Sequence, residues 1–273
     1  MPNPTIQNIQ RQNCPIGVFD SGIGGLSLLE AGRHQLPNEA WIYVADTAYL
    51  PYGNKPIEVI RDRAKKITEF LIQANVKAIL VACNTATALS IDFLRQHFKK
   101  TVFVGVEPAV RPAVKLTKTK VIGILATEAT TDSFRLSQLI SRFGTGIKVI
   151  IQPCHGLVES IESGQPGNQT SKRLVTKYVK PLLKQGVDTI ALGCTHYSFV
   201  TSIIKEVTGE SINLIDTGEP VMKELRERLS SKKILASKKM SPTQIWITES
   251  SPGKNNVIQT ICGDEIAINH VTI

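Results

Sequence analysis

Two cysteines at matching points of the chain could carry proton-transfer chemistry. Cys83 stands in the run Ala82-Cys83-Asn84-Thr85-Ala86, and Cys194 stands 111 residues later in the run Gly193-Cys194-Thr195-His196-Tyr197. Each follows a short apolar segment typical of a buried strand, and each precedes hydroxyl or amide side chains. Because open α/β sheets bind ligands at the carboxyl ends of their parallel strands, we expect both thiols to face a ligand.

Thiols on opposite sides of one cleft would suit a racemase. One group must remove the α-proton from one face of a planar carbanion, and the other must deliver a proton to the opposite face. A free thiol has a pKa of about 8.5, so neighbouring groups must tune it for work near neutral pH. Asp20 ends an earlier predicted strand and could sit beside one cysteine, while His196 lies two residues beyond the other.

Further polar segments also follow predicted strands. The glycine-rich loop Asp20–Gly25 precedes a predicted helix, so its backbone N–H groups could bind a phosphate or a carboxylate. It lacks the spacing of a dinucleotide or nucleotide phosphate loop. Tyr52 and Gly53 could contact a ligand or form a plain turn. The threonines of residues 127–131 could face the same cleft or cap a helix.

Length and composition indicate a globular enzyme. The 273 residues suffice for one large or two modest α/β domains with buried cores. Hydrophobic residues make up 42% and charged residues 20%, which is ordinary for this class. The formal net charge of +9 is spread along a chain with only 5% aromatic residues. Without a nucleic-acid motif, this charge predicts a solvated surface and no nucleic-acid partner.

The sequence carries no signature of a membrane span, export or a metal centre. No run approaches the ~20 apolar residues that a membrane helix needs. Met1–Asn13 is polar, so we expect a short disordered leader and a cytoplasmic protein with reduced thiols. The five cysteines form no CxxC pair and no Cys/His metal spacing, so we expect no disulfide framework and no metal. Cys14, Cys154 and Cys262 are expected to be buried apolar residues.

Apolar runs alternate with amphipathic segments through most of the chain. Helical spacing of apolar residues predicts helices at residues 26–35, 56–74 and 87–98. Short apolar runs predict strands at residues 16–19, 41–45, 78–82, 102–106, 121–125, 148–151, 189–192 and 213–215. Strands separated by such helices predict an α/β fold with parallel sheets.

A weak internal repeat predicts two related domains. The run Ala78–Cys83 is similar to Thr189–Cys194, and Glu107-Pro108 is matched 112 residues later by Glu219-Pro220. The similar offsets predict two pseudo-symmetric domains, each a mainly parallel sheet flanked by helices, with the active site in the cleft between them. We place the first domain at 1–110 plus 216–273 and the second at 111–215.

Four motifs together resemble those of the glutamate racemase family. They are the run Ile16-Gly-Val-Phe-Asp-Ser-Gly-Ile-Gly-Gly-Leu26, the pair Asp46-Thr47 followed by Leu50-Pro51-Tyr52-Gly53, and the two cysteine runs quoted above. The resemblance covers about residues 16–220. It implies a cofactor-independent enzyme that interconverts L- and D-glutamate, supplies D-glutamate for peptidoglycan synthesis and is frequently a homodimer.

The resemblance also implies roles for individual residues. Cys83 and Cys194 would be the catalytic thiols. Asp20, His196 and Glu159 would assist them, with Glu162 as the alternative carboxylate because the chain departs from the family pattern around Cys154 and His155. Substrate contacts are implied for the following residues: Ser21, Tyr52, Gly53, Asn84, Thr85, Thr130 and Thr195.

Other functions remain open at this point. A related racemase for aspartate or hydantoins fits the same motifs, because spacing does not reveal the length of the substrate. A decarboxylase of the same architecture would not need a cysteine at both positions 83 and 194. A non-catalytic binding protein would not need the polar neighbours of both cysteines. No lysine stands in a context that indicates a pyridoxal-phosphate enzyme.

Overall fold

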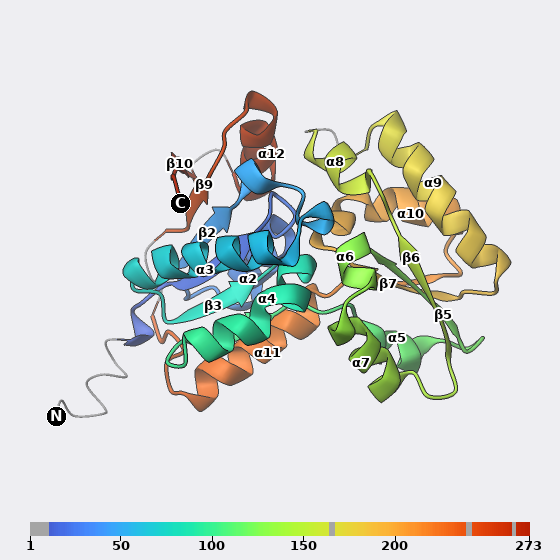
Figure 1. Ribbon diagram of the computed structural model, residues 1–273, viewed down its shortest axis with the longest axis horizontal. Coiled ribbons are helices and arrows are strands. Elements are labelled where there is room, and N and C mark those ends of the chain that lie inside the picture. The colour runs from blue at the N-terminus through green and yellow to red at the C-terminus, as the bar shows by residue number, and fades with distance from the viewer. Residues whose placement is uncertain (1–10, 164–166, 239–241, 264–265) are drawn as a thin grey trace.

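Two β-sheets lie side by side, and each is flanked by helices. The computed structural model describes residues 11–163, 167–238, 242–263 and 266–273. Figure 1 shows the larger sheet and its helices on the left, which we call the first lobe, and the smaller sheet on the right, which we call the second lobe. Most of the predicted leader, residues 1–10, lies outside the described residues.

The first lobe has six parallel strands in the order β10-β9-β2-β1-β3-β4. Its strands are β1 (Ile16–Asp20), β2 (Trp41–Ala45), β3 (Ala78–Val81), β4 (Phe103–Gly105), β9 (Gln244–Ile247) and β10 (Ile268–His270). Helices α2 (Leu26–Gln35), α11 (Gly218–Ser231) and α12 (Pro252–Cys262) bury apolar side chains on one face of this sheet. Helices α3 (Ile57–Gln73) and α4 (Asn84–His97) cover the other face.

The second lobe has four parallel strands in the order β6-β5-β7-β8. Its strands are β5 (Val121–Ala126), β6 (Lys148–Pro153), β7 (Thr189–Gly193) and β8 (Asn213–Ile215). Helices α8 (Leu157–Glu162), α9 (Gln169–Lys184) and α10 (Thr201–Thr208) pack on one face. Helices α5 (Val110–Leu116) and α7 (Phe134–Phe143) pack on the other, and α6 (Glu128–Thr131) is a single turn after β5.

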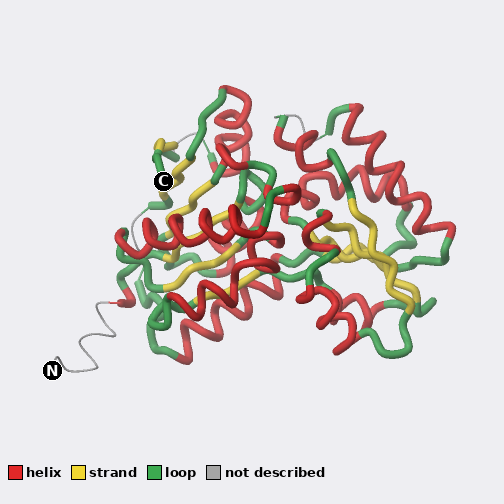
Figure 2. Tube along the Cα trace, in the orientation of Figure 1, coloured by secondary structure: helices red, strands yellow, loops and turns green. Residues whose placement is uncertain are grey.

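These layers confirm the predicted α/β class with two mainly parallel sheets. Figure 2 shows strands enclosed between helices in both lobes. The order of the four strands in the second lobe repeats that of β2, β1, β3 and β4 in the first, so β7 occupies the place of β3. The segments after β3 and β7 are therefore equivalent, and these segments carry Cys83 and Cys194.

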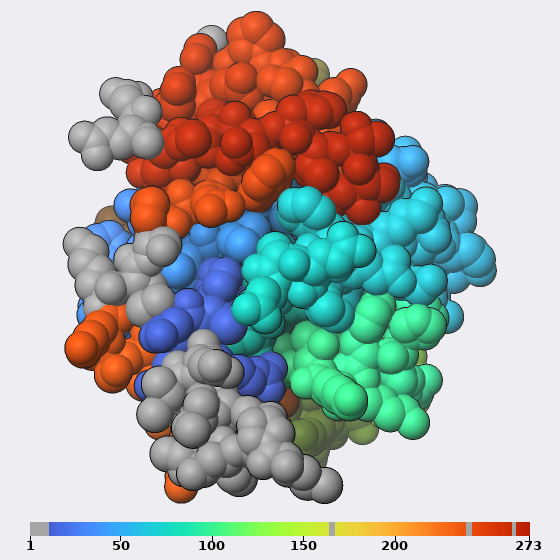
Figure 3. Space-filling model, turned by 90° about the vertical axis from the view of Figure 1, so that its left-hand side faces the viewer, coloured from blue at the N-terminus to red at the C-terminus, as the bar shows by residue number. Residues whose placement is uncertain are grey.

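The C-terminal segment returns to the first lobe. Strand β9 pairs with β2, with Tyr43 opposite Ile245, and β10 extends the same edge. Figure 3 shows this segment, in red, packed against the blue and cyan N-terminal half of the chain. The boundaries at residues 110/111 and 215/216 stay predictions.

Helix α4 begins three residues before the predicted start at residue 87. Cys83 is its N-cap, and the Cys83 sulfur accepts a hydrogen bond of 3.4 Å from the backbone N–H of Ala86. A side chain that accepts such a bond satisfies one of the free N–H groups of a first turn. Asn84 and Thr85 therefore lie in the first helical turn.

Asp188, directly before β7, binds the loop before β5 through hydrogen bonds. Its carboxylate accepts hydrogen bonds from the Thr117 hydroxyl at 2.6 Å and from the backbone N–H groups of Lys118 at 2.6 Å and Thr119 at 2.8 Å. Burial alone would raise the pKa of Asp188, but these hydrogen bonds and one from Thr189 lower it to about 2. The ionised form is therefore the one that stabilises this loop.

We expect Asp188→Asn to destabilise the protein at neutral pH and much less in acid. An unfolded aspartate has a pKa of about 3.9, so the lowered folded pKa stabilises the native state above about pH 4. This contribution is lost as the pH falls from about 4 towards 2. Urea unfolding of both proteins at several pH values measures the difference. If the difference in the free energy of unfolding between the two proteins did not shrink in acid, the stabilising role of the ionised Asp188 would be contradicted.

Candidate active site

Two buried thiols lie at equivalent places in the two lobes. Cys83 follows β3 at the start of α4, and Cys194 follows β7 at the start of the short 3-10 helix η3 (Thr195–Val200). They are 5% and 7% exposed. Burial raises the pKa of Cys83 above its usual value, and the negative charges of Asp20 and Cys194 raise it further. The two thiols are therefore alike in position and in burial.

Asp20 joins the two lobes beside Cys83. One oxygen of its fully buried carboxylate accepts hydrogen bonds from the Ser21 hydroxyl at 3.0 Å and the Gly22 N–H at 3.3 Å. The other accepts one from Thr195 of the second lobe at 2.7 Å. The Cys83 sulfur lies 3.9 Å from the Ser21 hydroxyl oxygen. Three predicted site residues, Asp20, Ser21 and Thr195, are thus brought together with Cys83 in one network.

A histidine and a carboxylate accompany Cys194. His196 Nδ1 lies 3.8 Å from the Cys194 sulfur, and its Nε2 lies 2.6 Å from Glu162 Oε1. Burial alone would lower the pKa of His196, but its hydrogen bonds to Cys194 and Glu162 outweigh burial and raise the pKa well above its usual value. A protonated imidazole held in this way can hydrogen-bond to a thiolate at Cys194.

Glu162, and not Glu159, lies against His196. Glu159 stands in the first turn of α8 with an exposed side chain and lines a cavity of about 100 Å³ between the lobes. Glu162 ends the same helix, is buried, and also accepts the Ile23 N–H of the first lobe at 2.7 Å. The structure therefore brings the alternative carboxylate, Glu162, and not Glu159 to His196. The phase of a six-residue helix, which begins after Gly156 in the left-handed conformation, decides which glutamate faces inward.

A cluster of three hydroxyl groups also joins the lobes. The Thr85 hydroxyl lies 2.9 Å from that of Thr127 and 3.4 Å from that of Thr130, and Thr127 and Thr130 are 2.9 Å apart. Thr127 is also the N-cap of α6. It therefore both caps a helix and faces the other lobe, which are the two alternatives that the sequence left open for this segment. Thr127 is absent from the substrate contacts that the family resemblance implies. Thr131 lies outside the cluster, because its hydroxyl donates to Glu128.

Some buried polar atoms near the thiols lack a partner. Within the described residues, neither amide atom of Asn84 and not Oε2 of Glu162 makes a hydrogen bond, although all three atoms are buried. A buried polar atom without a partner costs about 1–3 kcal/mol. A bound ligand that supplies the missing hydrogen bonds would remove this cost.

The glycine-rich loop is packed against the second lobe. A Cβ atom on Gly24 would lie 2.3 Å from His196 Nδ1, and one on Gly22 would lie 2.0 Å from Glu162 Oε1. Both positions therefore require glycine. The N–H groups of Gly22 and Ile23 already bind protein carboxylates, so the loop serves carboxylate groups rather than a phosphate in this arrangement.

Tyr52 and Gly53 lie in the short 3-10 helix η2 (Tyr52–Asn54), which follows a second one, η1 (Thr47–Tyr49). The Tyr52 hydroxyl donates to Asp46 at 2.5 Å, so it is occupied within the first lobe. A Cβ on Gly53 would lie 3.0 Å from Thr127 Cβ of the second lobe. The structure thus places Gly53, but not the Tyr52 hydroxyl, against the residues of the site.

Arg63 holds this segment in place. Its guanidinium makes two hydrogen bonds to the fully buried Asp46 carboxylate, at 2.9 and 2.7 Å, and lies 4.0 Å from the centre of the Tyr49 ring. Asp46 in turn accepts hydrogen bonds from Tyr52 and from Thr248, which follows β9. One buried ion pair therefore fixes the loop that approaches the second lobe.

We expect Arg63→Met to lower the free energy of unfolding by about 3–5 kcal/mol, because it leaves the Asp46 carboxylate buried without its partner. Lys66→Met is the matched control, since Lys66 pairs with Asp62 at 3.0 Å on the surface, where both side chains are about half exposed. Its cost should stay within about 1 kcal/mol. Urea unfolding measures both. Equal losses in the two variants would contradict this role of Arg63.

The described residues contain no group of three or more His, Cys, Asp or Glu side chains that could hold a metal ion. None of their helices combines the length and apolar character needed to cross a membrane.

The chain matches known racemases along most of its length. The family model for Asp/Glu/Hydantoin racemase matches residues 27–225. The chain belongs to this family. It is 41% identical to a glutamate racemase of Ectopseudomonas mendocina, over 96% of this chain and 99% of the relative. It is 45% identical to one of Methylococcus capsulatus, over 88% of each chain.

Solved structures of the family share the whole fold. The glutamate racemase isoform RacE1 of Bacillus anthracis is 32% identical, with a TM-score of 0.88 over 96% of this chain and 98% of that chain. The Francisella tularensis glutamate racemase, solved in complex with D-glutamate, is 31% identical with a TM-score of 0.84 over the same shares. The chain is therefore an amino-acid racemase, an isomerase of the glutamate racemase type.

Proposed function

We propose that this racemase interconverts L- and D-glutamate by a two-base mechanism in which Cys83 and Cys194 are the acid and base. The observation that carries the proposal is the placement of two buried thiols at equivalent strand ends, each with its own polar partners. One thiolate removes the α-proton from one face of the substrate. The opposite thiol returns a proton to the other face, which inverts the α-carbon.

The two thiols have different polar neighbours. Asp20 and Ser21 lie beside Cys83, and His196 with Glu162 lies beside Cys194. We infer that Cys83 acts on D-glutamate and Cys194 on L-glutamate, as the family resemblance implies. Glu162 holds the imidazole and stabilises its protonated form, and a protonated His196 favours the Cys194 thiolate. Glu162 therefore takes the assisting role that Glu159 was expected to have.

Glutamate is the proposed substrate because the site offers hydrogen-bonding groups for carboxylates. Ser21, Asn84, Thr85 and Thr195 are buried beside the thiols, and both amide atoms of Asn84 lack a partner. We place the substrate carboxylates on these groups and on the Thr127–Thr130 pair. The buried thiols require the lobes to separate for substrate to enter, so closure on the substrate excludes water from the carbanion.

The experiment is racemisation by purified, chelator-treated protein. With L-glutamate as the only addition, the optical rotation should decay to zero, and D-glutamate should give the mirror-image course. Recovery of activity only after a metal or pyridoxal phosphate is added would overturn the cofactor-independent mechanism. Aspartate and norvaline are the comparison substrates, because a site built to hydrogen-bond a group rejects analogues that lack it. Faster turnover of aspartate would make this chain an aspartate racemase.

The resemblance to glutamate racemases also implies how the product is used, where the enzyme acts and how many chains it contains. We propose that the enzyme acts in the cytoplasm, supplies D-glutamate for peptidoglycan synthesis and forms a homodimer. Cells depleted of the protein should stop growing, and external D-glutamate should restore their growth. Sedimentation of the purified protein should give twice the single-chain mass of 29.9 kDa. A single-chain mass at working concentrations would exclude the dimer.

A further inference from the structure

A tyrosine in the core of the first lobe binds the glycine-rich loop. Tyr43 stands in the middle of β2, opposite Val18 of β1 and Ile245 of β9, and it is fully buried. Its hydroxyl donates a hydrogen bond of 2.6 Å to the backbone carbonyl of Gly22. Among the described residues, no other donor reaches this carbonyl oxygen. The sequence indicated Tyr43 only as part of a strand.

The Tyr43 hydroxyl keeps its proton. Burial raises the pKa of Tyr43 well above its usual value, and the negative charges of Asp20 and Glu162 raise it further. A neutral phenol is a hydrogen-bond donor, and a buried one needs a partner for its hydroxyl. Tyr43 therefore donates to the Gly22 carbonyl over the whole pH range in which the enzyme works.

The Gly22 carbonyl belongs to the same peptide group as the Ile23 N–H. This N–H donates to Glu162 Oε1 at 2.7 Å, and the same oxygen lies 2.6 Å from His196 Nε2. Because a peptide group is planar, a hydrogen bond that fixes its carbonyl also fixes the direction of its N–H. A donor on the carbonyl also polarises the group and strengthens the N–H as a donor. Tyr43 therefore bears on the contact between Glu162 and His196, although its hydroxyl binds neither.

The surroundings of His196 leave Glu162 as the link to the first lobe. Cys194 and Glu162 are the titratable groups whose hydrogen bonds and charges raise the pKa of His196. On the side of the first lobe, His196 packs against Gly24, which carries no charge. The carboxylate of the same loop, Asp20, binds the neighbouring Thr195 at 2.7 Å. The first lobe can therefore act on His196 through the Ile23 N–H and Glu162.

We propose that Tyr43 is a positioning residue for the Cys194 half of the active site, because its hydroxyl fixes the peptide group that holds Glu162 on His196. The inference rests on the proposed function, in which a protonated His196 favours the Cys194 thiolate. Without the hydroxyl, the Gly22 carbonyl is buried with no donor, which is unfavourable. The peptide group then turns to find a donor, and its N–H moves away from Glu162.

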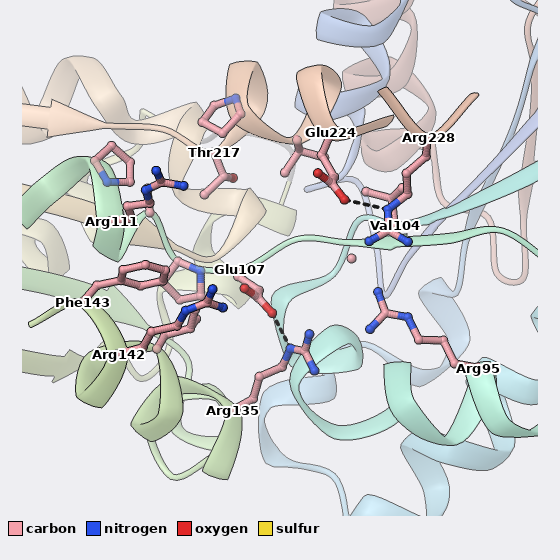
Figure 4. A pocket seen from close by; sticks show the side chains of 17 residues that line it. Arg95, Val104, Glu107, Arg111, Arg135, Arg142, Phe143, Thr217, Glu224 and Arg228 are labelled. Atoms are coloured by element: carbon pink, nitrogen blue, oxygen red, sulfur yellow. Dashed lines mark hydrogen bonds and ion pairs between the residues drawn. The ribbon is translucent and has the colours of Figure 1, made fainter. Parts of the chain in front are cut away.

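The contacts that link Tyr43 to His196 are separate from the large cavity between the lobes. Figure 4 shows this cavity, which has a volume of about 540 Å³ and is lined by five arginines among other residues. Neither Tyr43 nor Glu162 lines it. A substitution at Tyr43 therefore leaves the lining of this cavity unchanged, and its effects report on the glycine-rich loop.

The first experiment measures the pKa of His196 by NMR without glutamate, so its outcome is independent of the racemase mechanism. Tyr43→Phe removes the hydroxyl and keeps the ring. The matched control is Tyr178→Phe, because the buried Tyr178 of α9 also donates to a backbone carbonyl, that of His155, at 2.8 Å. Loss of the imidazole signals in His196→Gln assigns them. We expect the pKa of His196 to fall in Tyr43→Phe and to stay unchanged in Tyr178→Phe. An unchanged or raised pKa in Tyr43→Phe would overturn the proposal.

The second experiment measures racemisation of both enantiomers against pH. Tyr43→Phe should lower kcat/KM by about three- to tenfold, the effect of one neutral hydrogen bond. The alkaline fall of kcat/KM should move to lower pH, as in Glu162→Gln but less far, because the carboxylate is still present. Tyr178→Phe should leave the profile in place and lower kcat/KM by less than about twofold. Equal losses in the two tyrosine variants, or an unshifted profile in Tyr43→Phe, would overturn the positioning role.

The double variant Tyr43→Phe/Glu162→Gln tests whether Tyr43 acts through Glu162. Once Glu162 is replaced, loss of the Tyr43 hydroxyl should cost less than about twofold more, because groups in one hydrogen-bond network are not additive. A double loss equal to the product of the two single losses would overturn the link. Circular dichroism and urea unfolding verify that each variant is folded. Failure of the unaltered protein to racemise glutamate would contradict the proposed function, whereas the His196 titration would still decide the role of Tyr43.

Discussion

Cys83→Ser and Cys194→Ser are each expected to reduce racemisation about 10²–10⁴-fold in both directions, the usual contribution of a positioned acid or base. Serine is nearly the same shape as cysteine, but its hydroxyl is far less acidic and cannot serve as the thiolate. A full cycle passes through both groups, whichever enantiomer enters. Optical rotation with each enantiomer measures the loss, and near-normal racemisation by either variant would eliminate the two-cysteine mechanism.

The partial reaction should separate the two variants. In heavy water, Cys83→Ser retains Cys194 and should slowly exchange the α-proton of L-glutamate without inversion. Cys194→Ser retains Cys83 and should favour exchange of D-glutamate. Exchange is weak, because the same thiol must return the deuteron. Proton NMR of each enantiomer with each variant gives the rates. Preference of both variants for the same enantiomer would contradict the assignment of faces.

Glu162→Gln is expected to slow racemisation about 100-fold, while Glu159→Gln changes it by less than about threefold. The neutral amide of glutamine cannot stabilise a protonated His196, which Glu162 contacts at 2.6 Å. The Glu159 side chain is exposed at the small cavity between the lobes. Assays of L- and D-glutamate with both variants give the comparison.

The pH dependence gives this prediction a second readout. Because hydrogen bonds to Cys194 and Glu162 raise the pKa of His196, its protonated form persists well above pH 6.5. In Glu162→Gln the imidazole should lose its proton at lower pH, so the alkaline fall of kcat/KM should move to lower pH. A larger loss in Glu159→Gln, or an unshifted profile in Glu162→Gln, would return the assisting role to Glu159.

Apolar runs and the internal repeat predicted which residues stand at the strand ends of the site. Cys83 and Cys194 were identified because each ends an apolar run, and a strand of four or five buried residues is visible in such a run. The repeat predicted equivalent surroundings for them, and the matching strand orders of the two sheets agree with it. Asp20 was predicted as a site residue for the same reason, because it follows an apolar run and is the last residue of β1.

Other features depended on partners that are distant in sequence. Strands β9 and β10 were not predicted, because β9 is a strand through its pairing with β2, and β10 through its pairing with β9. The contact of Thr127 with Thr85 joins the N-cap of α6 to the first turn of α4, and these helices belong to different lobes. No local pattern distinguishes a threonine that caps a helix from one that also meets a ligand.

The sequence by itself determined the residue types, the strand ends that carry them and the pairing of two similar halves, because apolar periodicity and repetition are local properties. Only the tertiary structure decided that Glu162 and not Glu159 meets His196, because the phase of α8 depends on how it packs between the lobes. The cavity between the lobes that is lined by Arg95, Arg111, Arg135, Arg142 and Arg228 was likewise decided by folding, because these arginines come from four helices of the two lobes.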